Sequence, residues 1–182
     1  SGVLQQFLEG VEQAILVNNS GIIGPVNPPG RQDNREIITS VDLNVTAPLV
    51  LSNAFIKDTE HAADRRILHI SSGAGRKTMA GWSVYCATKA ALDHHARVVG
   101  EENISNLKIT SLAPGIIDTG MQADIRSTTV DAFPQLDTFR ELKTGGHLQS
   151  AIDTASAIAR MLLAPEFGSE QVTDIRDFGD IN

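Results

Sequence analysis

The feature that most constrains how this chain can fold is a set of four short apolar runs, rich in Ile, Val and Leu, that alternate with longer helix-like stretches. Continuous apolar runs of this kind are typical of parallel strands buried on both faces, and they occupy residues 14–17, 66–70, 107–112 and 171–175. The intervening stretches predict helices over residues 35–59, 83–102 and 150–163. This alternation predicts an α/β fold with a doubly wound parallel sheet.

The composition fits one globular domain and argues against several other classes of protein. With 182 residues, 41% hydrophobic and 20% charged, the chain can bury a core and is neither disordered nor membrane-spanning. The formal net charge is −7 and no basic stripe is visible, so nucleic acids and anionic membrane surfaces are poor partners. The single cysteine, Cys86, cannot form an internal disulfide, and no leader-like run is visible. We therefore expect a reducing, cytoplasmic location.

Loops rich in Gly, Pro, Asn and Ser follow the first three predicted strands. They cover residues 18–21, 24–30, 71–75 and 113–120. In an open parallel sheet the carboxyl ends of the strands share one edge, where helix N-termini point into a crevice, so we expect a ligand there. The segment 122–148, which Pro134, Gly145 and Gly146 interrupt, is expected either to form one or two short helices over this site or to be a plain surface excursion.

Tyr85 and Lys89 have the clearest chemical potential. They lie four residues apart near the start of a predicted helix, so both side chains project from one face. A nearby ammonium favours phenolate and would lower the pKa of Tyr85 from its usual value of about 10, which suits a general acid for a carbonyl. The alternative is an ordinary amphipathic helix on which the spacing has no chemical meaning.

Two polar residues elsewhere favour the chemical interpretation. Ser72 ends the preceding strand, where its hydroxyl could hydrogen-bond the same carbonyl oxygen. Asn44 lies inside the predicted helix 35–59, where an amide side chain is mildly unfavourable and indicates a specific role. His94 and His95 are adjacent on a helix and point in different directions, so we expect no metal site there.

Together these motifs resemble those of the classical short-chain dehydrogenase/reductase family. In chain order they are Asn18-Asn19-Ser20-Gly21, Asn44, Ser72, Tyr85-Cys86-Ala87-Thr88-Lys89 and Pro114-Gly115-Ile116-Ile117-Asp118-Thr119. Ser20 is the one departure, because the family usually has alanine there. The stretches 81–87, 113–122 and 139–145 resemble sepiapterin reductases and the related benzil-type diketone reductases of microbes, which reduce a carbonyl with NADPH.

The resemblance implies a Rossmann-like fold and a carbonyl reductase that uses NADP(H) rather than NAD(H). Tyr85 would give the proton to the substrate carbonyl, and Ser72 would polarise the carbonyl oxygen. Lys89 would hold the nicotinamide ribose, and Asn44 would fix a water that links Lys89 to solvent. An NAD-dependent alcohol or steroid dehydrogenase of the same family remains the alternative.

The resemblance also implies a set of binding residues. Those for the cofactor are Asn18, Gly21, Tyr85, Lys89, Pro114, Gly115, Ile117 and Thr119. Those for a pterin or diketone-like substrate are Ser72, Trp82, Met121 and Asp174. Asp174 would accept two hydrogen bonds from the edge of a pterin. The alternative for Asp174 is a solvated acid in an acidic tail, and Trp82 and Met121 are alternatively core or surface residues.

The extent and assembly of the chain are a final expectation. The resemblance implies that residues 1–182 form the C-terminal two thirds of one domain, with the family's first βαβ unit upstream of Leu4. The strand at 14–17 would then expose an apolar edge, and the chain would belong to a longer reductase. Alternatively it is a complete product that acts as an inactive interaction module. Ala87, Ala90 and Ala91 form a small-residue face suited to close packing, and the resemblance implies a homodimer or homotetramer, because in the family this helix packs against a second subunit.

Overall fold

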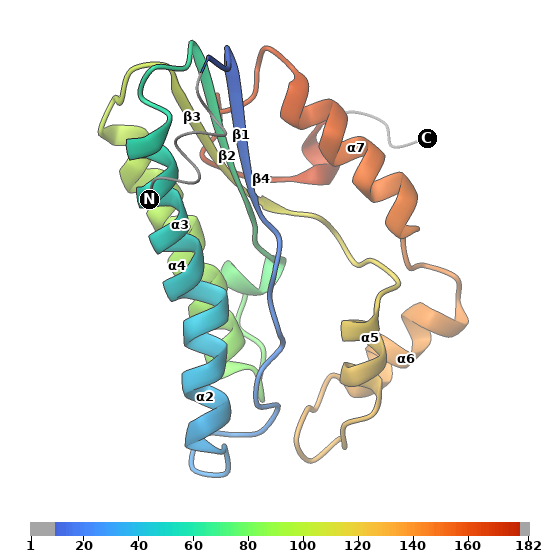
Figure 1. The fold of residues 1–182 in the computed structure, drawn as a ribbon. Helices are drawn as coiled ribbons and strands as arrows, with labels where there is room; N and C mark the ends of the chain where they lie inside the picture. Colours follow the sequence, from blue (N-terminus) through green and yellow to red (C-terminus); the bar gives the residue numbers. More distant parts are fainter. Residues whose placement is uncertain (1–9, 179–182) are drawn as a thin grey trace.

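The computed structural model describes residues 10–178 and shows one parallel sheet with helices on both faces (Figure 1). The strands lie in the order β1-β2-β3-β4, with bounds Gln13–Asn18, Asp64–Ile70, Leu107–Ala113 and Val172–Asp174. Each strand is parallel to its neighbours. The doubly wound α/β fold predicted from the sequence is therefore confirmed. The sequence also has an amphipathic stretch at residues 3–11, most of which lies outside the described residues.

Helices from the predicted stretches cover both faces of the sheet. One side carries α2 (Asn34–Val41), α3 (Ala47–Asp58) and α4 (Ser83–Glu101), and the other side carries α7 (Ala151–Leu163) (Figure 1). Side-chain caps define two of the starts, because such oxygens satisfy amides that have no partner inside the helix. Asp33 accepts from the Arg35 amide at 2.7 Å before α2, and Ser150 accepts from the Asp153 amide at 3.4 Å before α7.

The predicted helix at 35–59 contains an irregularity that the apolar pattern did not reveal. Between α2 and α3, residues Asp42–Thr46 form a π-helical turn, which contains Asn44. A π-helical turn adds a residue to one turn of a helix, and such turns occur often at functional sites. The turn therefore changes where Asn44 projects relative to a regular helix.

Alternate residues of β2 build the two halves of the core. Ile67 packs with Ala96 of α4 and Ile109 of β3 on one face. Leu68 packs with Leu112 of β3 and Met161 of α7 on the other. Because successive strand side chains point to opposite faces, a continuous apolar run fits this doubly covered strand.

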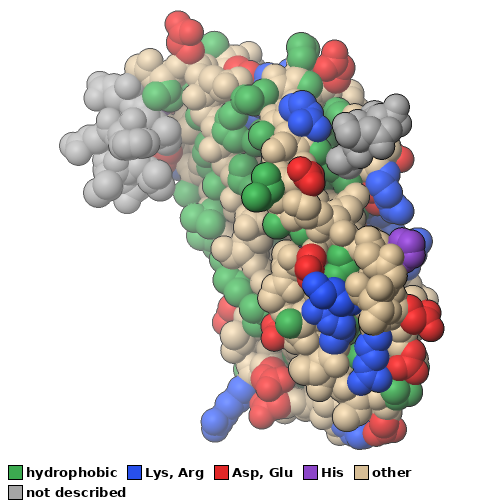
Figure 2. Space-filling view, turned by 90° about the vertical axis from the view of Figure 1, so that its right-hand side faces the viewer, with side chains coloured by type: hydrophobic (Ala, Val, Ile, Leu, Met, Phe, Trp, Pro, Cys, Tyr) green, Lys and Arg blue, Asp and Glu red, His purple; other side chains and the backbone are tan. Residues whose placement is uncertain are grey.

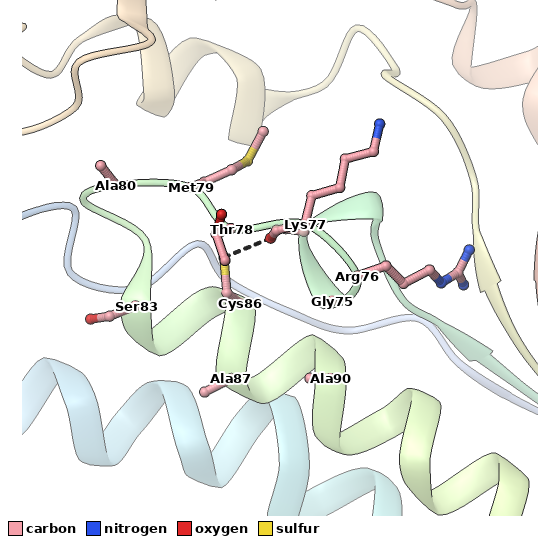
Figure 3. A pocket seen from close by; sticks show the side chains of 11 residues that line it. Gly75, Arg76, Lys77, Thr78, Met79, Ala80, Ser83, Cys86, Ala87 and Ala90 are labelled. Carbon is pink, nitrogen blue, oxygen red and sulfur yellow. Dashed lines mark hydrogen bonds between the residues drawn. The ribbon is translucent and has the colours of Figure 1, made fainter.

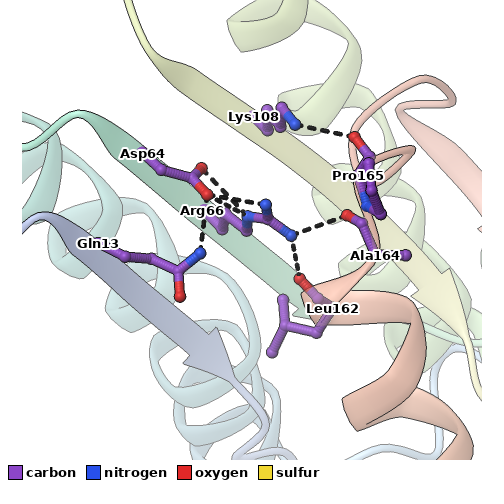
Figure 4. A network of polar contacts seen from close by, with 7 residues as sticks. All are labelled: Gln13, Asp64, Arg66, Lys108, Leu162, Ala164 and Pro165. Carbon is purple, nitrogen blue, oxygen red and sulfur yellow. Dashed lines mark hydrogen bonds and ion pairs between the residues drawn. The ribbon is translucent and has the colours of Figure 1, made fainter.

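A buried arginine fastens the start of β2 to the end of α7 (Figure 4). Arg66 pairs with Asp64, the closest contact being 2.7 Å between Nη2 and Oδ2. Its Nη1 also donates to the carbonyl oxygens of Leu162 and Ala164, at 2.6 and 2.9 Å. These carbonyls lie at the C-terminal end of a helix, where they lack helical partners. Charge pairing and these bonds explain how a guanidinium is accommodated in a buried strand.

The segment between β3 and α7 forms two short helices, α5 (Gly120–Arg126) and α6 (Leu136–Thr144). They lie beyond the carboxyl ends of the strands, on the side of the sheet that carries α7 (Figure 1). Trp82 stacks on Phe133 with ring centroids 4.5 Å apart and meets Phe139 edge-on at 5.4 Å. This aromatic cluster holds the segment against the start of α4. Of the two possibilities raised for residues 122–148, two short helices is correct.

β1 is an edge strand within residues 10–178, since it pairs only with β2. Its side chains Ile15 and Val17 are 36% and 41% exposed, so the expected apolar edge is present. Figure 2 shows hydrophobic side chains gathered in a band over one side of the molecule. Within the same residues, no helix is both long enough and apolar enough to cross a membrane.

Candidate active site

The first turns of α4 bring Tyr85 and Lys89 together, as their spacing predicts. Both are buried, and the Lys89 Nζ lies over the Tyr85 ring at 5.6 Å from its centroid. Nζ donates a hydrogen bond of 2.8 Å to the carbonyl oxygen of Ile70, the last residue of β2. The lysine side chain is thus anchored at the carboxyl end of the sheet, beside the tyrosine.

Burial lowers the pKa of Lys89 to about 8, and nearby Asp93 opposes this shift. At neutral pH the ammonium is still the main form. An ammonium has three N–H donors, and Ile70 uses one of them. Two donors therefore remain for hydroxyl groups of a ligand.

The pKa of Tyr85 shifts in the direction opposite to the one predicted. Burial raises the pKa of Tyr85, and this outweighs a side-chain hydrogen bond with Ser72 that lowers it. The phenol lies in an apolar cluster with Trp82, whose ring meets it edge-on at 5.5 Å. The predicted lowering by Lys89 is therefore wrong for the protein alone. Because the pKa of Tyr85 is raised, the phenol stays protonated at neutral pH.

Ser72 lies two residues after the end of β2, near the tyrosine. Its Oγ accepts a hydrogen bond of 3.2 Å from the Ala74 amide and so caps the short 3-10 turn Gly73–Gly75. The same side chain interacts with Tyr85. The cap fixes Ser72 just after β2, near Tyr85 of α4.

Asn44 clamps the loop after β1 onto α4. Its Oδ1 accepts from the Ile22 amide at 2.9 Å, and its Nδ2 donates to the Ile22 carbonyl at 2.8 Å and to Thr88 Oγ1 at 3.2 Å. The side chain is fully buried. Both N–H donors are used, so a water at this side chain would rely on the second lone pair of Oδ1. The clamp itself was not foreseen from the sequence.

Gly21 passes close to two buried polar side chains. A Cβ at this position would lie 3.3 Å from Asn44 Oδ1 and 3.4 Å from Lys89 Nζ. The loop therefore passes directly over two of the predicted catalytic residues. A glycine leaves room here for close approach of backbone and ligand.

The loop after β3 carries the predicted nicotinamide-binding residues. Gly115 has a φ of 84°, in the left-handed region, and a Cβ there would collide with Gln149 Oε1. Ile117 forms an isolated parallel bridge with Gln149, and the Gln149 amide donates to the Ile116 carbonyl at 2.9 Å. Gln149 thus straps the loop that follows Pro114. Sequence reasoning missed Gln149, because only the fold brings it beside residue 115.

The predicted substrate residues fall into two places. Trp82 and Met121 pack in the same cluster as Tyr85, whose hydroxyl donates to the Met121 Sδ at 3.9 Å. Asp174 lies at the end of β4, where its carboxylate oxygens each accept from Arg176 at 2.7 Å. This pairing lowers the pKa of Asp174. Its carboxylate is thus already bound by a guanidinium.

A pocket of about 690 Å³ lies on a different face of α4, under the loop 74–80 (Figure 3). Cys86, Ala87 and Ala90 line it, and the Cys86 thiol makes a weak 3.7 Å hydrogen bond to the Lys77 carbonyl. Tyr85 and Lys89 do not line it. The pocket is therefore separate from the candidate site, even though the same helix builds both.

The site combines a buried phenol, a serine hydroxyl and a lysine at the carboxyl edge of a doubly wound sheet. This combination on this fold is typical of nicotinamide-dependent oxidoreductases. The chain belongs to the short-chain dehydrogenase family, whose family model matches residues 4–130.

Similar proteins agree with this assignment. A benzil reductase that forms (S)-benzoin, from Bacillus cereus, is 38% identical over 171 residues, covering 92% of this chain and 69% of the relative. Sepiapterin reductase from Bos taurus is 31% identical over 174 residues, covering 93% and 64%. A crystal structure of a short-chain dehydrogenase/reductase from Burkholderia vietnamiensis has a TM-score of 0.62 and 36% identity, covering 98% and 68%. Two other neighbours in fold, 21% and 22% identical, are complexes with NADP and NADPH. This chain spans about two thirds of the length of its curated relatives.

Proposed function

We propose that this protein is an NADP(H)-dependent carbonyl reductase that acts on a diketone-like or pterin substrate. The observation that carries the proposal is the placement of buried Tyr85 with the Lys89 Nζ 5.6 Å from its ring centroid and with Ser72 near enough to influence its pKa. The names of the similar proteins, benzil reductase and sepiapterin reductase, support a dicarbonyl or pterin substrate. The cofactor, when bound, supplies the hydride.

Tyr85 is the proposed proton donor. Its raised pKa keeps the hydroxyl protonated at neutral pH, which is the form that a reduction needs. In the protein alone this hydroxyl donates to the Met121 thioether, at 3.9 Å. Because a thioether is a weak acceptor, a substrate carbonyl oxygen can replace it at little cost. Ser72 would then donate to the same oxygen and stabilise negative charge as it develops.

Lys89 is the proposed ligand of the nicotinamide ribose, since it has two N–H donors beyond the bond to Ile70. A cation nearby would also favour the tyrosinate that remains after proton transfer. Asn44 would hold the loop that carries Gly21 and fix a water beside Lys89. That water would return a proton to Tyr85 through the lysine after each turnover.

The remaining cofactor residues would act mainly through their backbone. Pro114, Gly115 and Ile117 would hold the nicotinamide, with a further bond from the Thr119 hydroxyl. The Gln149 strap keeps this loop in place. Asn18 and Gly21 would line the adenosine side, where Gly21 leaves room for close approach.

The substrate would lie between the catalytic hydroxyls and the segment 122–148. Trp82 and Met121 would form an apolar wall, and α5 and α6 would cover it. Asp174 would anchor a pterin only if Arg176 releases its carboxylate, so pterin binding has a cost that diketone binding lacks. Residues 1–182 would form the C-terminal part of one reductase domain.

Association of two or four copies is also proposed. Ala87, Ala90 and Ala91 form a small-residue face on α4 that suits close packing against another helix. Light scattering of the purified protein would give the mass of the assembly. A monomer at micromolar concentration would contradict this part of the proposal.

The test of the proposal is a cofactor titration followed by a substrate panel. The purified protein is titrated with NADPH and with NADH, and then assayed with benzil, sepiapterin and a ketosteroid. Tighter binding of NADPH, with turnover of benzil or sepiapterin, is expected. Preference for NADH and the steroid would favour the dehydrogenase alternative. Absence of binding to both cofactors would contradict an enzymatic role for this chain.

A further inference from the structure

A chain of hydrogen bonds links Asn18, at the carboxyl end of β1, to two histidines. Asn18 and His69 are register partners on β1 and β2. Asn18 Nδ2 lies 3.0 Å from His69 Nδ1, and His69 Nε2 lies 3.0 Å from His95 Nδ1 on α4. His69 is fully buried, whereas His95 is partly exposed. None of these contacts involves the proposed reacting groups.

The chemistry of the groups fixes the direction of this chain. An amide nitrogen can only donate, so His69 Nδ1 accepts and the ring proton lies on Nε2. Nε2–H then donates to His95 Nδ1. Both rings must be neutral for this pattern to hold. Burial lowers the pKa of His69 to about 3, with smaller contributions from His95 and Lys89 that outweigh Asp93. Burial also lowers the pKa of His95.

The two N–H groups of the Asn18 carboxamide are both used by neighbours. One donates to His69, and the other donates to Ser52 Oγ on α3 at 3.3 Å. With both donors held, the carboxamide cannot rotate, and its oxygen has a single orientation. Asn18 is therefore fixed from β2 and α3 at once.

We propose that His69, held in its tautomer by His95, is a positioning residue that fixes Asn18 and thereby the cofactor-binding loop 18–21. The inference rests on the proposed cofactor site. Gly21, three residues after Asn18, lies close to Asn44 and Lys89, since a Cβ built on it would come within 3.3 Å of Asn44 Oδ1 and 3.4 Å of Lys89 Nζ. A displaced Asn18 would therefore disturb the place where the ribose and adenosine are expected.

Substitutions that keep or remove single hydrogen bonds test this role. His69→Asn keeps an acceptor where Nδ1 lies, whereas His69→Leu removes it and leaves an amide donor of Asn18 unpaired. We expect His69→Leu to raise the NADPH dissociation constant about tenfold or more, and His69→Asn to change it less than about threefold. Rescue by asparagine separates the hydrogen bond from mere filling of space. Thermal unfolding of each variant measures its stability separately.

His95 provides the second pair of variants, because a half-buried position tolerates change if His69→Leu fails to fold. His95→Leu removes the acceptor that selects the His69 tautomer, and His95→Asn retains one. Weaker NADPH binding in His95→Leu, restored in His95→Asn, supports the proposal. An NADPH dissociation constant of His69→Leu within about twofold of the wild-type value would overturn the proposal. If His69→Leu is unfolded, the same result for His95→Leu would overturn it. Failure of the wild type to bind NADPH or NADH would instead reject the proposed function.

Discussion

Removal of the Asn44 side chain should destabilise the protein in a way that can be worked from its contacts. Asn44→Ala leaves the partly buried amide and carbonyl of Ile22 without partners and also removes a bond to Thr88. Unpaired groups of this kind cost about 1–3 kcal/mol each when buried, so we expect a loss of about 2–4 kcal/mol. Alanine recovers up to about 0.7 kcal/mol through its higher helix propensity.

The net loss of about 1.3–4 kcal/mol corresponds to a melting temperature lower by about 3–16 °C for a chain of this length. Circular dichroism at 222 nm during heating measures it. Asn53, exposed on α3, provides the matched control, and Asn53→Ala should change stability by less than about 0.5 kcal/mol. A melting temperature of Asn44→Ala within about 1 °C of this control would refute the reasoning that Asn44 clamps the loop.

Three further predictions concern the core, a charge and the substrate. Phe133→Ala should lower the free energy of unfolding by about 3–5 kcal/mol. It should also red-shift the fluorescence of the single tryptophan, Trp82, because Trp82 stacks on Phe133. Phe178→Ala, which changes a partly exposed ring, is the control. Folding lowers the pKa of Lys89 from 10.5 to about 8. Between about pH 8 and pH 10.5 the unfolded chain therefore binds more protons than the folded protein. In this range the free energy of unfolding of the wild type should rise with pH relative to that of Lys89→Met. Urea unfolding at about pH 7.5 and about pH 9.5 measures this difference, and equal pH dependence of both proteins would contradict it. Asp174→Ala should reduce turnover of sepiapterin much more than that of benzil in steady-state assays, and equal losses would reject the pterin anchor.

The fold was largely predictable because its strands carry an unusually simple signal. β1, β2 and β3 each contain a short run rich in Ile, Leu and Val, and turn-forming residues follow soon after, a pattern typical of strands buried on both faces. The exact ends were less predictable, since they depend on side-chain bonds made after folding. β4 ends at Asp174 because this residue caps the following 3-10 turn, and β2 begins at Asp64, where it pairs with Gln13 of β1.

The candidate site was predictable as a set of residues but not as an electrostatic environment. The i, i+4 spacing placed Tyr85 and Lys89 on one face of a helix whatever the rest of the chain does. The burial that raises the Tyr85 pKa comes partly from Phe133 and Phe139, about fifty residues away in sequence. A local sequence pattern cannot predict a contact between residues so far apart in the chain.

Residues that act by positioning other residues were the hardest to predict from the sequence. Gln149 lies in an unremarkable stretch before α7, and His95 was interpreted only as a helix residue without metal partners. Their contacts with Gly115 and His69 exist only once β2, β3 and α4 have assembled. Asn44 was found because an amide inside an apolar helix is unusual, although the bonds it makes to Ile22 were not foreseen.

The most direct test of the account is the rate of a single turnover in Tyr85→Phe, measured from the loss of NADPH absorbance with benzil as substrate. Phenylalanine keeps the ring in its cluster and removes only the hydroxyl. Loss of a positioned general acid should slow the step by about 10²–10⁴-fold. The NADPH dissociation constant should change by less than about threefold. A rate within about tenfold of wild type would contradict the central claim that Tyr85 delivers the proton.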